Sequence, residues 1–71
     1  MLAALDARIS LARRHVRIGH SVITRQRDVV ARKQSFGKDA SSAEELLALF
    51  ENSQLMFQDD LARLLRERDE L

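Results

Sequence analysis

The sequence has no cysteine, proline, tryptophan or tyrosine, and only two of its 71 residues are glycine. Without cysteine, neither a disulfide nor a cysteine-ligated metal can stabilise the chain. The absence of proline and the small number of glycines fit long helices, and the many Ala, Leu, Arg and Glu residues favour them. A chain this short forms at most one domain with a small core, so association with another chain is the remaining means of stabilisation.

Two segments carry apolar residues at the alternating three- and four-residue spacing of a coiled-coil-like helix seam. The first seam consists of Leu2, Leu5, Ile9, Ala12, Val16, Gly19, Ile23, Gln26, Val30 and Lys33. The second consists of Ala43, Leu47, Phe50, Gln54, Phe57, Leu61, Leu64, Arg68 and Leu71. We therefore expect one all-α domain over 1–71, an antiparallel hairpin with helices at about 2–34 and 42–70 and a turn at about 35–41.

The turn carries its own signals. Gly37 is suited to end the first helix, because glycine readily adopts the left-handed conformation found there. Ser41 or Ser42 is expected to cap the second helix, with Glu44 or Glu45 completing a capping box.

Gly19, Phe50 and Phe57 are expected to pack inside the hairpin. If the turn is centred near Lys38, Gly19 faces Phe57 and Gln26 faces Phe50. Gly19 weakens a helix by about 1 kcal/mol relative to alanine, and room for an aromatic ring would compensate. The alternative is a glycine that is tolerated or that marks a slight bend.

Gln26 and Gln54 interrupt otherwise apolar seams. Because buried amides need hydrogen-bond partners, we expect them to bond to each other or to a neighbouring subunit. The alternative is a partly hydrated position near the edge of a bundle.

The apolar arc of both helices is too wide for a single partner helix. The residues expected to supply intersubunit surface are Val22, Val29, Leu46, Leu49 and Met56. The simplest assembly is a dimer that forms a four-helix bundle, with another helical protein as the alternative partner.

The net charge of +1 conceals a division between the two halves. Residues 1–38 carry nine Lys or Arg against two acids, and residues 39–71 carry three Arg against nine acids, giving +7 and −6. This division favours packing of the basic helix beside the acidic one.

A row of basic residues in the first helix suggests RNA or DNA binding as the alternative function, through Arg13, Arg14, Arg17 and Arg27. The acidic second helix and the lack of free aromatic residues for base stacking count against it.

No arrangement of side chains suggests an enzyme, a cofactor or a metal site. His15 and His20 are five residues apart and diverge by about 140° on a helix, which leaves His15 available to line a subunit interface. The adjacent carboxylates in Glu44–Glu45 and Asp59–Asp60 also diverge.

One set of residues resembles a group of small uncharacterised bacterial helical-hairpin proteins. The shared pattern is His15-Val16, Gly19, Arg25-Gln26-Arg27, Ala43, Leu46-Leu47, Phe50-Glu51 and Ser53-Gln54. It covers about the middle half of the chain, and the segment from Leu55 onward departs from the His-rich ending of that group. The resemblance implies a bacterial cytosolic hairpin and carries no activity with it.

The amino-terminal residues have neither a basic leader nor an apolar stretch of signal-peptide length, and nothing approaches the length of a membrane span. We therefore expect a cytoplasmic structural or adaptor protein that acts by helix-mediated self-association or protein–protein interaction.

Overall fold

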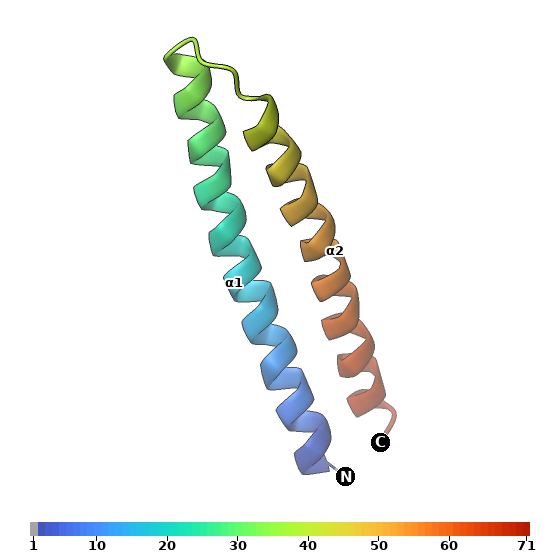
Figure 1. Cartoon of the computed structure of the whole chain (residues 1–71). Helices are drawn as coiled ribbons and strands as arrows, with labels where there is room; N and C mark the ends of the chain where they lie inside the picture. Colours follow the sequence, from blue (N-terminus) through green and yellow to red (C-terminus); the bar gives the residue numbers. More distant parts are fainter. Residues whose placement is uncertain (1) are drawn as a thin grey trace.

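The computed structural model describes residues 2–71, which form two long helices, α1 (Leu2–Ser35) and α2 (Ser41–Asp69). They pack side by side in opposite directions, so the start of α1 and the end of α2 lie together and the turn lies at the far end (Figure 1). The hairpin measures 54 × 14 × 13 Å. The predicted all-α antiparallel hairpin is confirmed: α1 begins at the predicted residue, and the other three helix ends differ from the predicted ones by one residue.

A glycine ends α1, as predicted. Gly37 has a φ of 67°, in the left-handed region that side chains with a Cβ rarely adopt. The backbone N–H of Lys38 donates to the carbonyl of Lys33 at 2.8 Å, and that of Gly37 donates to the carbonyl of Gln34 at 3.1 Å. This pair of bonds is a Schellman motif, which satisfies two of the free carbonyls at the helix end.

The predicted serine cap of α2 is wrong. The capping position is Ala40, whose side chain cannot cap, and the helix already begins at Ser41. The carboxylate of Asp39 accepts hydrogen bonds from the backbone N–H of Ser41 at 3.0 Å and from its hydroxyl at 2.6 Å. Glu44 does not fold back to complete a capping box, because its carboxylate accepts a hydrogen bond from Gln34 of α1. Asp39 therefore takes the role that the sequence suggested for serine.

The core is one side chain thick and consists of two clusters. The cluster near the open end contains Leu5, Ile9, Ala12 and Leu64, with Leu61 and Leu65 packed against it. The cluster near the turn contains Val30, Ala40 and Ala43, with Val29 and Leu47 packed against it. Between them only Ile23 and Gln54 are buried. The middle of the hairpin is therefore the part with the least apolar packing.

Two glutamines join the helices in a reciprocal arrangement. The Nε2 atom of Gln26 in α1 donates to the carbonyl of Ala43 in α2 at 2.9 Å. The Nε2 atom of Gln54 in α2 donates to the carbonyl of Val16 in α1, also at 2.9 Å. The expectation that the two amides bond to each other is wrong, because each reaches the backbone of the opposite helix instead.

The structure also corrects the predicted register. The atoms closest to the side-chain direction of Gly19 belong to Gln54, not to Phe57. Phe57 packs instead against His15, with the ring centroids 5.2 Å apart. The reason lies in the turn, where the Schellman motif reverses the chain before Lys38 and Ala40 already packs against α1. This compact reversal moves α2 along α1 relative to a turn centred on Lys38.

Within residues 2–71, two of the three ion pairs between the helices follow the division of charge in the sequence, and the third, Arg68 of α2 with Asp6 of α1 at 3.9 Å, runs the other way. Arg27 pairs with Glu51 at 3.2 Å and Arg8 approaches Glu67 at 4.0 Å, each joining a base of α1 to an acid of α2. Both pairs are largely exposed to solvent, so each contributes only about 0 to 1 kcal/mol. Charge therefore favours this helix pairing, while the apolar clusters and the two glutamines hold it.

Candidate functional site

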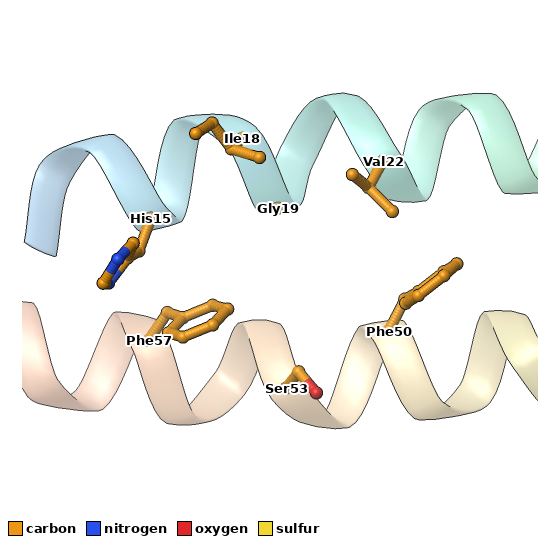
Figure 2. Close-up of a pocket in the computed structure, with 7 residues that line it drawn as sticks. All are labelled: His15, Ile18, Gly19, Val22, Phe50, Ser53 and Phe57. Atoms are coloured by element: carbon orange, nitrogen blue, oxygen red, sulfur yellow. The ribbon is translucent and has the colours of Figure 1, made fainter.

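A shallow groove of about 290 Å³ lies between the helices at the middle of the hairpin. Its lining residues are His15, Ile18, Gly19 and Val22 of α1 and Phe50, Ser53 and Phe57 of α2 (Figure 2). Only His15 and Ser53 among them carry polar side-chain atoms. The groove therefore suits apolar contacts better than polar recognition.

Helical periodicity places these side chains on one face. His15, Ile18 and Val22 follow each other at three and four residues along α1, as Phe50, Ser53 and Phe57 do along α2. Gly19 lies between Ile18 and Val22 and contributes only backbone to the lining of the groove (Figure 2). The groove is thus a gap in the side-chain layer between two long helices.

The groove is the centre of a larger surface. Leu11 shares a hollow with His15 on one side, and Met56 shares another with His15 and Phe57. Val29, Leu46 and Leu49 continue the same three- and four-residue spacing beyond the groove. We call this surface the apolar face, and its residues are Leu11, His15, Ile18, Val22, Val29, Leu46, Leu49, Phe50, Met56 and Phe57.

Several of these side chains are strongly exposed. Met56 exposes 72% of its surface and Leu49 exposes 61%, while Leu11, Ile18 and Leu46 are also exposed. Single exposed apolar residues are ordinary, but a continuous patch of large ones marks a binding surface.

All five residues predicted to supply intersubunit surface lie on the apolar face. Val22 and Val29 are half-buried, whereas Leu46, Leu49 and Met56 are exposed. Of the three residues predicted to pack inside the hairpin, Gly19 and Phe50 are half-buried, and Phe57 keeps 37% exposure at the groove. The sequence did not indicate the groove itself, although an apolar arc too wide for a single partner helix predicted an uncovered face.

The opposite flank of α2 has a different character. Leu55 exposes 59% of its surface there, close to the value for Leu49, but its helical neighbours include Glu51, Asn52 and Gln58. Glu51 is paired with Arg27 on that side. Leu55 is thus a single apolar residue on a charged surface, and it is a useful reference for residues of the apolar face.

The arginines considered for nucleic-acid contact are not equivalent. Arg13, Arg14 and Arg17 are exposed and form no ion pair with any of residues 2–71. Arg27 is bound to Glu51 of α2. The structure thus leaves three of the four available to a ligand.

Within residues 2–71, no group of three or more histidine and acidic side chains is placed to hold a metal ion. Neither of the two described helices is long and apolar enough to cross a membrane. Comparison with known protein families, curated proteins and solved structures gave no match.

Proposed function

We propose that the protein is a small structural or adaptor protein whose activity is helix-mediated association. Its partner is a second copy of the chain, and the two hairpins form a four-helix bundle through their apolar faces. The observation that carries this proposal is the concentration of large exposed side chains, above all Leu49 and Met56, on the one face that contains the groove.

The surface area of the hairpin supports the proposal. Its exposed surface is 5489 Å². A compact monomer of 8.1 kDa exposes about 4,500 Å², so the hairpin has an excess of roughly 1,000 Å². A standard protein interface buries about 800 Å² on each partner. Covering one face of the hairpin would therefore remove about the excess that its elongated shape creates.

The shape of the apolar face favours a second copy. It is two helices wide and lies around the middle of the hairpin, with a core cluster on either side of the groove. A two-fold rotation through such a central patch covers both copies of it at once, as in a closed isologous dimer. Two antiparallel hairpins joined in this way make a four-helix bundle.

The test compares Leu49→Glu with Leu55→Glu, since the two leucines have nearly equal exposure on opposite flanks of α2. Size-exclusion chromatography with light scattering should show a dimer at micromolar concentration for the parent chain and for Leu55→Glu. Leu49→Glu should shift to monomer or lose helicity, because it places a charge on the apolar face. Met56→Glu is a second substitution on the same face and should behave like Leu49→Glu.

A thermal melt of the parent chain at several concentrations provides an independent check, because the melting temperature of a dimer rises with protein concentration. A parent chain that is monomeric and melts at the same temperature at all concentrations contradicts the proposal. A dimer that remains intact in both Leu49→Glu and Met56→Glu also contradicts it.

We propose RNA or DNA binding through α1 as the second candidate function, supported by the exposed and unpaired Arg13, Arg14 and Arg17. Binding driven by phosphate contacts weakens steeply as salt rises. The assay uses generic RNA and duplex DNA at two salt concentrations, with Arg13→Gln/Arg17→Gln as the variant. Absence of binding at low salt removes this candidate.

A further inference from the structure

We infer that the second copy places its α2 on α1 of the first, about a two-fold axis parallel to the helices, so that both turns lie at the same end of the bundle. This inference rests on the proposed dimer and specifies its geometry. It follows from the positions of four unpaired charges beside the apolar face.

Two arrangements can cover a face made of two antiparallel helices under two-fold symmetry. An axis parallel to the helices places α1 on the partner's α2 and keeps both turns at one end. An axis perpendicular to the helices, within the plane of the face, places α1 on the partner's α1 and α2 on the partner's α2. In that second arrangement the turns lie at opposite ends.

The charge of each helix favours the first arrangement. The segment Leu2–Ser35 carries eight Lys or Arg and two Asp, and Ser41–Asp69 carries three Arg and seven acids, giving +6 and −4. The second arrangement brings the basic helices together and the acidic helices together. Opposite charges across helix interfaces select partner and orientation, and like charges oppose association.

Individual residues at the margin of the face lead to the same arrangement. The unpaired bases there are Arg14 and Arg25 of α1, and the unpaired acids are Glu45 and Asp59 of α2; all four are exposed and form no ion pair within residues 2–71. These four unpaired charges are thus basic on α1 and acidic on α2, whereas Arg63 of α2, which lines the hollow beside Met56, is already paired with Asp60.

The position of these charges along the hairpin distinguishes the two arrangements. His15 packs against Phe57, so Arg14 of α1 lies at about the height of Asp59 of α2. A two-fold axis parallel to the helices leaves the position of each residue along the hairpin unchanged in the second copy. It therefore places Arg14 near Asp59 of the second copy. Arg25 then lies near Glu45 of that copy, within reach of a long side chain. Because of the symmetry, each attractive pair occurs twice.

A two-fold axis perpendicular to the helices, passing through the middle of the groove, inverts the order of residues along the hairpin in the second copy. Arg14 and Arg25 lie at similar distances on either side of the Ile18–Val22 segment, so Arg14 would approach Arg25 of the second copy. Glu45 would approach Asp59 for the same reason on α2. The same four residues are therefore attractive in one arrangement and repulsive in the other.

The first experiment measures the distance between the two turns. The chain has no cysteine, so Lys38→Cys provides a single attachment site for a spin label in the exposed turn. Helices in contact are 8 to 10 Å apart, so turns at one end should give a dipolar distance below about 30 Å. Turns at opposite ends of a molecule 54 Å long should give a distance near that length, and this result would overturn the inference while leaving the dimer intact. A labelled chain that light scattering shows to be monomeric contradicts the proposed dimer instead.

The second experiment uses the sign of a charge reversal. Arg14→Glu faces an acid in the inferred arrangement and should raise the dimer dissociation constant by at least about threefold at low salt. In the alternative arrangement it would face Arg25 and lower that constant. Arg17→Glu is the matched control, because it makes the same change of charge on the same helix away from the apolar face. An unchanged or lowered constant for Arg14→Glu relative to Arg17→Glu overturns the inference.

Discussion

Gly19 of α1 lies against the side-chain amide of Gln54 of α2, so closely that a Cβ at Gly19 would collide with the Oε1 atom. The same amide donates from Nε2 to the carbonyl of Val16, less than one turn of α1 away. The absent side chain thus provides the space for a hydrogen bond between the helices. Gly19 therefore weakens α1 at the position where the side chain of Gln54 must approach its backbone closely.

Gly19→Ala should destabilise the protein by about 1 to 2 kcal/mol, although alanine is normally better than glycine in a helix by about 1 kcal/mol. The new methyl group displaces the amide and breaks its hydrogen bond, which leaves buried polar atoms unpaired. In a Gln54→Ala background the same substitution should stabilise by about 1 kcal/mol, because the obstacle is gone. Urea unfolding of the four chains at one subunit concentration measures both effects. Equal effects of Gly19→Ala in the two backgrounds would show that the contact has no energetic weight.

The two glutamines should respond differently to replacement by methionine, which has a similar length and no amide. Gln54 is buried, and its Oε1 atom makes no hydrogen bond within residues 2–71. Gln54→Met loses one hydrogen bond, worth about 1 kcal/mol, but removes a buried unpaired acceptor that costs about 1 to 3 kcal/mol. It should therefore be neutral or stabilising. Gln26 is only half-buried, so Gln26→Met should cost about 1 kcal/mol. Thermal unfolding of the two variants tests this. A larger loss of stability for Gln54→Met than for Gln26→Met would contradict the expected cost of the unpaired oxygen.

Gly37→Ala should destabilise by about 1 to 2 kcal/mol, because alanine is strained at a positive φ. A Cβ at Gly37 meets nothing within 4 Å, so the cost is purely conformational. Gly37→Asn should cost less, since asparagine tolerates the left-handed conformation better than alanine. Denaturant unfolding of the two variants tests this order, and an asparagine variant no more stable than the alanine variant would count against it.

Asp39 should make the stability of the turn depend on pH. Hydrogen bonds from the hydroxyl and the backbone N–H of Ser41 lower the pKa of the Asp39 carboxyl, with a contribution from the charge of Lys33. Because the folded state lowers this pKa, the stabilisation is present above the ordinary carboxyl value, about 4, and is lost as the pH falls through the lowered one.

Asp39→Asn is the matched variant, because it resembles the protonated acid. The melting temperature of the parent chain should exceed that of Asp39→Asn at pH 6, and the difference should shrink below about pH 4. A difference that is constant from pH 6 to pH 2 would show that the charge of Asp39 does not matter.

The heptad spacing and Gly37 were sufficient to predict two helices, their antiparallel packing and the end of α1. They were not sufficient to predict the register, because a seven-residue repeat allows a helix to slide along its partner while apolar residues still meet apolar residues. The choice is made by the left-handed Gly37, by the burial of Ala40 and by the two amides that reach opposite carbonyls. Of these features only Gly37 has a distinctive sequence pattern.

The candidate site shows the same limit. Exposed residues such as Leu49 and Met56 were predictable, because they widen the apolar arc beyond what one helix can cover. The groove was not predictable, because it depends on which residue of α2 stands beside Gly19. The predicted register placed Phe57 beside Gly19, whereas the structure has Gln54 there and Phe57 in the lining of the groove.

The separation of the core into two clusters has a consequence for the order in which the hairpin closes. Only 13 residues separate Val30 from Ala43 near the turn, whereas 52 separate Ala12 from Leu64 near the open end. Bringing the second pair together from an open chain costs about 1 kcal/mol more loop entropy. The hairpin should therefore zip from the turn and fray from its termini, so amide hydrogen exchange should be slower around Val30 than around Ile9. A tag or fused domain at either end then meets the part of the chain that folds last.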